Sequence, residues 1–199
     1  MKIYIKYVLI IFTAINFVAC KSYKAITTDG KDDKKNTSSN STSLKKKYAE
    51  KLGVSESDIK NANLYQFINE WYGVPYKYAG KDKNGIDCSG LTSTLYAKVY
   101  AKKISPSTKA LIDEVKKIKE SDLKEGDLVF FNIGTSHPSH VGVYLQNHKF
   151  VHASSKKGVM ISDLNESYFK KYFYSAGRVK WVIQQLKNTA FTCLFKKRC

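Results

Sequence analysis

Residues 85–91 read Gly-Ile-Asp-Cys-Ser-Gly-Leu and join a loop to an apolar segment that continues through Leu95 and Val99. The spacing of the three apolar residues predicts a helix that starts at or just after Cys88. Because the positive end of a helix dipole stabilises a thiolate, we expect the pKa of Cys88 to be lowered. The unpaired N–H groups of the first turn can also bind an oxyanion. The stretch therefore predicts a nucleophilic cysteine; a buried structural cysteine is the alternative, and the flanking glycines and the helix start argue against it.

Two histidines lie in short runs that alternate as β-strands do. His140 opens the run His-Val-Gly-Val-Tyr-Leu, and His152 lies within Phe-Val-His-Ala-Ser. If residues 146–148 form a three-residue turn, His140 and His152 project from one face of a hairpin as near or diagonal neighbours. On that face, we expect Gly142 to leave room for a helix end or a substrate. A thiol, an imidazole and a third polar group that fixes the imidazole tautomer are what a cysteine acyl-transfer site requires.

The order of helical and strand patterns predicts an α+β domain. Apolar residues at helical spacing predict one helix over 64–72 and another over 111–118, before and after the helix at Cys88. After Gly126 the pattern changes to short β-type runs separated by turn residues, at 128–131, 141–145, 150–153, 159–161 and 178–183. Helices first and strands later indicate helices packed on one face of a central antiparallel sheet.

The N-terminal segment predicts export to the cell envelope. Residues 1–19 combine early positive charge with an apolar stretch too short for an ordinary transmembrane helix, which is typical of a signal peptide. Ala19 followed by Cys20 resembles the bacterial lipobox, although Phe17 stands where leucine is usual. We therefore expect lipidation of Cys20, with a plain signal peptide or an uncleaved anchor as the alternative. Lipidation would anchor the chain to a bacterial membrane on its periplasmic or surface face.

Composition divides the rest of the chain into three segments. Residues 20–43 are mainly Lys, Ser, Thr, Asp, Asn and Gly, so we expect a flexible tether that cannot bury enough apolar surface to order itself. Residues 44–183 hold the patterns described above and form the predicted catalytic domain. In the C-terminal tail, residues 184–199, Cys193 and Cys199 either close a small disulfide loop or remain idle thiols.

The charge of the chain limits the class of partner. The 199 residues include 34 Lys and Arg against 17 Asp and Glu, a formal net charge of +17. Such a balance favours nucleic acid, acidic lipid or an acidic wall polymer. The export signal, and lysines scattered without a recognition motif, argue against nucleic acid. The charge is therefore interpreted as a solvated surface suited to an anionic cell wall.

Five stretches in order resemble the NlpC/P60 family of cell-wall cysteine peptidases. They are residues 71–78 (Trp-Tyr-Gly-Val-Pro-Tyr-Lys-Tyr), 85–91, 126–131 (Gly-Asp-Leu-Val-Phe-Phe), 139–144 (Ser-His-Val-Gly-Val-Tyr) and 150–154. The resemblance implies a compact papain-like fold. It also implies a cysteine endopeptidase that hydrolyses peptidoglycan stem peptides through a thioester acyl-enzyme. The bond implied joins γ-D-glutamyl to diaminopimelate or lysine.

The resemblance assigns roles to particular residues. It implies that Cys88 is the nucleophile, His140 the base and His152 the residue that orients the base. It places Tyr76 near the thiol, where its hydroxyl can support the oxyanion or the substrate. Ala79 stands where the family often has glycine, which points to a slightly altered approach loop.

Other polar residues receive weaker assignments. By the same resemblance, Asp87 and Ser89 line the substrate cleft, and Asp87 could recognise the free amine of a stem peptide. His137 and His148 are expected to be exposed surface residues, and Asp127 to have a structural role. No cofactor is implied, and a metal site lacks a short-spaced ligand pair. A monomeric enzyme is expected; a non-catalytic wall-binding lipoprotein, or a thiol amidase or acyltransferase acting on another bond, is the alternative.

Overall fold

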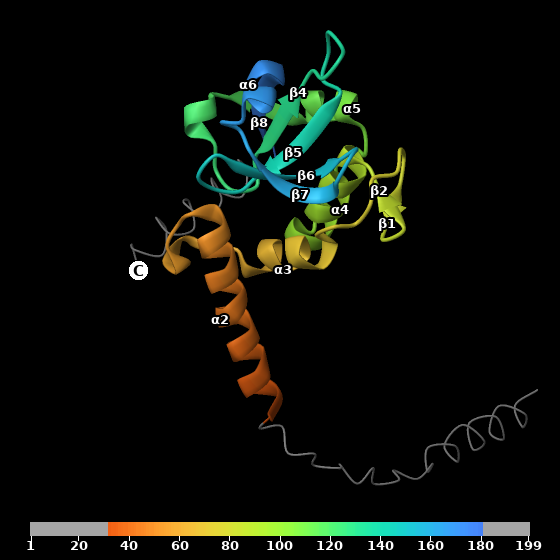
Figure 1. Cartoon of the computed structure of the whole chain (residues 1–199). Coiled ribbons are helices and arrows are strands. Elements are labelled where there is room, and N and C mark those ends of the chain that lie inside the picture. The colour runs from red at the N-terminus through yellow and green to blue at the C-terminus, as the bar shows by residue number, and fades with distance from the viewer. Residues whose placement is uncertain (1–31, 181–199) are drawn as a thin grey trace, which may run out of the picture. The chain divides into compact units, whose positions relative to one another are not determined.

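The computed structural model describes residues 32–180 (Figure 1). The chain divides into two units, Met1–Ser38 and Ser39–Cys199. Of the first unit only the beginning of a helix, from Asp32, is described, and apart from it the features below belong to the second. Among the described residues, no helix is both long and apolar enough to cross a membrane. Several predicted features lie outside the described residues: the signal peptide over 1–19, Cys20, the tether over 20–31, and the tail over 184–199 with Cys193 and Cys199.

A six-stranded sheet forms the centre of the second unit, with strand order β3-β8-β4-β5-β6-β7 and antiparallel neighbours throughout. Its strands are β3 (Val115–Ile118), β4 (Leu128–Phe131), β5 (His140–Tyr144), β6 (Lys149–Ser154), β7 (Gly158–Asp163) and β8 (Phe173–Val179). A separate antiparallel pair is formed by β1 (Lys81–Asp82) and β2 (Gly85–Ile86).

Most of the helices precede the central strands in the sequence. They are α2 (Asp32–Leu52), α3 (Ala62–Trp71), α4 (Cys88–Tyr100), α5 (Thr108–Glu114) and α6 (Ser167–Tyr172), with 3-10 turns at Glu56–Asp58 and Glu120–Asp122. Helix α4 starts at Cys88, as predicted, and α3 starts at Ala62, two residues before the predicted range of 64–72. Together with the antiparallel sheet they confirm the predicted α+β fold class.

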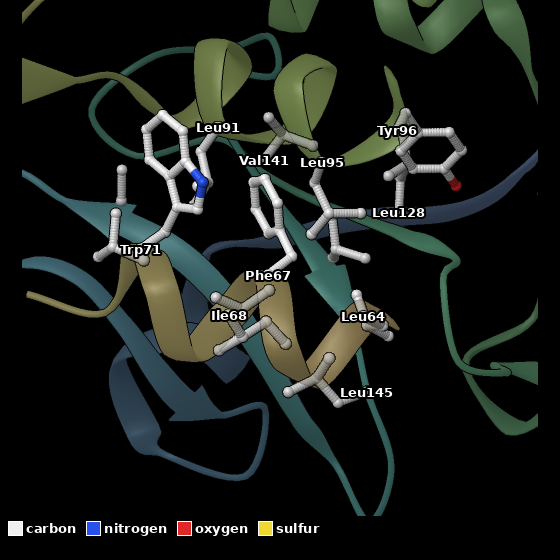
Figure 2. Packing of buried hydrophobic residues seen from close by; sticks show 14 of the residues in the cluster. Leu64, Phe67, Ile68, Trp71, Leu91, Leu95, Tyr96, Leu128, Val141 and Leu145 are labelled. Carbon is white, nitrogen blue, oxygen red and sulfur yellow. The ribbon is translucent and has the colours of Figure 1, made fainter. Parts of the chain in front are cut away.

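The larger hydrophobic core lies between α3, α4 and one face of the sheet. Figure 2 shows the side chains that meet there: Leu64, Phe67, Ile68, Trp71, Leu91, Leu95, Tyr96, Leu128, Val141 and Leu145. The helical spacing of the α3 residues puts them on one side of the helix, as predicted. Tyr72 departs from the prediction, because it follows the helix end and is exposed. Cys88 belongs to this core, so the start of α4 is fixed by packing.

A smaller apolar cluster lies on the opposite face of the sheet. Phe131 of β4 and Phe150 of β6 contact Phe169 of α6, with ring centroids 5.2 and 4.8 Å apart. His140 shares this face, because it pairs with Phe131 in the β4–β5 register. The sequence did not predict this cluster, since α6 is too short to show a helical period.

The predicted tether is helical in its second half. The expectation of a coil over 20–43 is wrong from Asp32 onward, where α2 begins. Tyr48 and Leu52, near the end of α2, are buried in the core. Because extending an existing helix costs much less than nucleating one, a packed C-terminal part favours helix in the polar residues before it.

Two further segments differ from the sequence prediction. The helix expected over 111–118 ends at Glu114, and β3 follows, paired with β8. Branched Val115 and Ile118 match the helical spacing, yet they fit an edge strand at least as well. The last strand, expected at 178–183, begins at Phe173 instead. Its first half consists partly of small residues, which hide the strand pattern; residues 181–183 lie outside the described part.

Candidate active site

Asp87 fixes the start of the helix that carries Cys88. One carboxylate oxygen accepts from the backbone N–H of Gly90 at 2.6 Å and lies 2.9 Å from the Ser89 hydroxyl. The other accepts from the N–H of Ala79 at 2.9 Å, so Asp87 ties the preceding loop to α4. This is the arrangement of an N-cap residue. Recognition of a substrate amine by Asp87 stays a prediction, and the amine would share oxygens that already accept hydrogen bonds.

The thiol of Cys88 is buried and lies beside a hydroxyl. The residue is 7% exposed, and its Sγ is 3.7 Å from Oγ1 of Thr108 on α5. Burial raises the pKa of Cys88, and hydrogen bonds from the Val141 backbone and the Thr108 hydroxyl oppose this without reversing it. The prediction of a lowered pKa is therefore wrong for this structure. The helix start is where the sequence predicts it, but burial of the charged thiolate outweighs its effect.

His140 and His152 form a hydrogen-bonded pair. Nε2 of His140 lies 2.8 Å from Nδ1 of His152, with the rings nearly perpendicular. The hairpin has the predicted three-residue turn over 146–148, closed by a 2.8 Å bond from the N–H of Leu145 to the carbonyl of Lys149. This loop length puts both histidines on one face as diagonal neighbours, as predicted.

Both imidazoles are uncharged at neutral pH. Burial lowers the pKa of His140 to about 4. Burial, together with the nearby His140, lowers the pKa of His152 to about 3. Nε2 of His152 lies 3.0 Å from Oγ of Ser162, a buried serine on β7. The histidine pair is therefore neutral in this structure.

Gly142 does not leave open space on the histidine face. A Cβ at this position would lie 2.5 Å from Cδ2 of Phe150 and 3.0 Å from the carbonyl oxygen of Val151. The expectation that a helix end or substrate approaches there is wrong. The glycine instead lets the Phe150 ring approach β5 closely, and that ring contacts His152 at a centroid distance of 5.0 Å.

The proposed site residues line two adjoining cavities of about 450 and 260 Å³. Tyr76, Cys88 and Ser139 line both. The larger cavity also includes Asp87, Ser89, Thr108 and two lysines, Lys81 and Lys109; the smaller includes His140, His152 and Tyr168. Burial and the nearby thiol raise the pKa of Tyr76, so its hydroxyl remains a hydrogen-bond donor. The cleft thus divides at the thiol into a lysine-lined part and a histidine-lined part.

Sequence reasoning missed Thr108, Ser162 and Phe169, all of which contact a site residue. Polar residues at single positions carry no periodic signal, and the approach of α5, β7 and α6 depends on the whole fold. His137 is exposed at the rim of the larger cavity and His148 lies in the hairpin turn, in line with their predicted surface positions. Within residues 32–180, no group of three His, Cys, Asp or Glu side chains is arranged to hold a metal ion.

Relatives of known name match the part of the chain that holds the site. Over 126 residues it is 39% identical to the murein DD-endopeptidase MepS/murein LD-carboxypeptidase of Escherichia coli K12, which covers 63% of this chain and 66% of that protein. It is 36% identical over 127 residues to the probable endopeptidase NlpC of the same strain, a match that covers 63% of this chain and 82% of that protein. This chain thus spans slightly less than two thirds of the first relative.

Solved structures lead to the same family. An NlpC/P60 family protein from Bacillus cereus ATCC 10987 matches with a TM-score of 0.54 and 28% identity, over 59% of this chain and 39% of that one. An NLP/P60 family protein from Staphylococcus aureus Mu50, described as similar to lipoprotein, matches with a TM-score of 0.53 and 29% identity, over 59% of this chain and 40% of that one. A family model described as the NlpC/P60 family matches residues 73–178, more than half of the chain. With its five ordered motifs and the α+β fold of those structures, the chain belongs to the NlpC/P60 family.

Proposed function

We propose that this chain is a cysteine endopeptidase that hydrolyses peptidoglycan stem peptides. One observation carries the proposal: Cys88, at the start of α4, lines the same cavity as the hydrogen-bonded pair of His140 and His152. A thiol, a base and a group that orients the base are the minimum for acyl transfer by cysteine. The name of the E. coli relative at 39% identity, a murein DD-endopeptidase, supports the cell wall as the substrate.

The ring nitrogens define the order of proton transfers. Nε2 of His140 bonds to His152, which leaves Nδ1 for the proton of Cys88. As Sγ bonds to the carbonyl carbon of the scissile amide, the thiol proton moves to Nδ1 and negative charge develops on the carbonyl oxygen. The first-turn N–H groups of α4 and the Tyr76 hydroxyl are the candidate donors to that oxygen.

Collapse of the tetrahedral intermediate breaks the amide C–N bond. His140 returns the proton to the leaving amine, and the acyl group remains on Cys88 as a thioester. A water molecule then loses a proton to His140 and attacks the thioester carbonyl. The product leaves as a carboxylic acid, and the thiolate regains its proton from His140. Because the pKa of His140 is about 4, its imidazole is unprotonated throughout the neutral range.

Two bonds compete as the target. The family resemblance favours the bond between γ-D-glutamyl and diaminopimelate or lysine. The E. coli relative at 39% identity is instead named a DD-endopeptidase, which favours a bond between two D-configured residues of a cross-link. We propose the γ-D-glutamyl bond as the first candidate and the DD bond as the second. A non-catalytic wall-binding lipoprotein has no need of the histidine pair.

Digestion of purified peptidoglycan with the full chain tests this proposal. Mass spectrometry should detect new fragments ending at D-glutamate with the wild type and none with Cys88→Ala. Fragments opened at the cross-link would select the DD bond. His140→Asn should be inactive, whereas His148→Asn, a matched change of a turn histidine, should retain activity. No fragments from a folded wild-type chain would contradict hydrolysis and favour the binding role.

We also propose that lipidated Cys20 anchors the chain to a bacterial membrane through the segment up to residue 43. The lipobox-like pair Ala19-Cys20 and the net charge of +17, suited to an anionic wall, support this. Labelled fatty acid should be incorporated into the wild type during expression in bacteria and not into Cys20→Ala. Equal labelling of both chains would contradict an anchor at Cys20.

A further inference from the structure

Ser162 ends a chain of hydrogen bonds that begins at the site. It lies on β7, is 5% exposed, and its Oγ is 3.0 Å from Nε2 of His152. Nδ1 of His152 is in turn 2.8 Å from Nε2 of His140. Ser162 is not among the described residues that line the two cavities. Its hydroxyl can therefore influence the reacting atoms only through the two imidazoles.

We propose that Ser162 is a positioning residue that holds both histidines in the tautomers required by the reaction, an inference that rests on the proposed function. For Nδ1 of His140 to accept the Cys88 proton, the resting proton of His140 must lie on Nε2. That proton is donated to Nδ1 of His152, which must be bare. The proton of His152 then lies on Nε2 and is donated to Oγ of Ser162. The opposite tautomers would put a proton on Nδ1 of His140 and leave no lone pair for the thiol.

The surroundings of His152 make this hydrogen bond important. The residue is 4% exposed, and its ring contacts the rings of Phe150 and Phe169 at centroid distances of 5.0 and 5.4 Å. Apolar rings accept no ordinary hydrogen bond from Nε2. Without the Ser162 hydroxyl, the N–H at Nε2 would be buried without the acceptor that it has in this structure.

The Ser162 hydroxyl also helps to stabilise the positive charge that develops on His140 during the reaction. His140 becomes an imidazolium as it takes the thiol proton, and its positive charge favours hydrogen bonds that point away from it. His152 accepts at Nδ1 and donates at Nε2, and Ser162 accepts, so the dipoles of both groups are oriented to stabilise the charge. No proton leaves His152 or Ser162 in this step.

Kinetics on peptidoglycan test the positioning role. Ser162→Ala should lower kcat about tenfold, the effect of losing one buried hydrogen bond, with KM unchanged because the hydroxyl does not touch the substrate. Ser162→Thr keeps the hydroxyl and should recover most of kcat. Ser175→Ala truncates another buried serine, which lies in β8 opposite Phe130 of β4, and should retain kcat. A wild-type kcat for Ser162→Ala, or an equal loss in the two alanine variants, would overturn the inference.

Nitrogen-15 NMR of the histidine side chains tests the tautomers in the full chain without substrate. His140 and His152 should both be protonated at Nε2 and bare at Nδ1, and Cys88→Ala should show the same pattern. A proton on Nδ1 of His152 in the wild type would overturn the inference even if the chain hydrolyses peptidoglycan. A folded chain that shows the expected tautomers but hydrolyses nothing would contradict the proposed function and support the hydrogen-bonding role of Ser162.

Discussion

A methyl group added at Gly142 should disturb the histidine pair without touching the substrate. The Cβ of Gly142→Ala would lie 2.5 Å from Cδ2 of Phe150. Carbon atoms normally approach to about 3.5–4.0 Å, so the Phe150 ring must retreat by about 1 Å. Phe150 is fully buried and already contacts the rings of Phe131 and Phe169 in the smaller apolar cluster. Because these rings enclose it, we expect the displaced ring to press on His152, which it contacts at a centroid distance of 5.0 Å.

The size of the effect follows from this geometry. Overpacking a well-packed core costs about 1–3 kcal/mol of unfolding free energy. For a domain of this size, that corresponds to a fall in Tm of roughly 2–12 °C. A misplacement of about 1 Å at a catalytic group costs on the order of 100-fold in rate. We expect Gly142→Ala to lower kcat by about 10- to 100-fold, since the shift reaches His140 only through His152.

Thermal unfolding by circular dichroism and the rate of peptidoglycan hydrolysis measure the two effects separately. Gly177→Ala is the matched control, because its Cβ would collide with the side chain of Val115 at the β3–β8 edge, away from the histidines. It should lower Tm and retain kcat. Gly142→Ala with a lowered Tm and a wild-type kcat would refute the coupling of Phe150 to the histidine pair, as would an equal loss of kcat in both variants.

Three other predictions concern the thiol, the pH dependence and a buried ion pair. Thr108→Val removes a hydrogen bond that lowers the pKa of Cys88, so alkylation by iodoacetamide should slow several-fold at pH 7; an unchanged rate would contradict this. Unfolded histidines bind protons below a pKa of about 6.5, whereas the buried pair stays neutral down to about 4 and 3. Urea unfolding should therefore show that the free energy of unfolding decreases as the pH is lowered from 6.5 to 4, by on the order of 3 kcal/mol for each histidine. The decrease should be smaller when His152 is replaced by Phe. Arg178 donates two hydrogen bonds to the carboxylate of Asp127, a residue that is 3% exposed. Arg178→Met removes both and should lower the free energy of unfolding by about 3–5 kcal/mol. Adding Asp127→Leu to this variant should recover much of the lost stability.

The hairpin that carries both histidines could be predicted because its determinants are local. Side chains alternate with a period of two along a strand, and a three-residue loop fixes which residues share a face. His140 and His152 therefore fall on one side whatever the rest of the fold does. The start of α4 was equally accessible, since Asp87 is an N-cap residue followed by apolar residues at helical spacing. The catalytic roles of Cys88, His140 and His152 remain a prediction for the variants to test.

Groups brought in from distant segments could not be predicted in this way. Ser162 reaches His152 because the β6–β7 register pairs it with Phe150, and this register depends on the turn between the strands. Thr108 reaches the thiol through the packing of α5. The pKa of Cys88 depends on burial by the whole domain, which outweighs the local effect of the helix start. Local patterns thus locate the reactive groups, while packing decides their environment.

Cys88 and His140, the proposed nucleophile and base, come from opposite faces of the sheet and line one cavity at the end of a strand. Cys88 belongs to the core that contains Val141, whereas His140 pairs with Phe131 on the other face. In the middle of the sheet, the ladder of backbone hydrogen bonds would separate a thiol on one face from an imidazole on the other. His140 is the first residue of β5, and Cys88 receives a hydrogen bond from the backbone of the next residue, Val141. The strand end therefore lets both side chains reach one cavity while each stays anchored in its own apolar cluster, which holds them more rigidly than loops would.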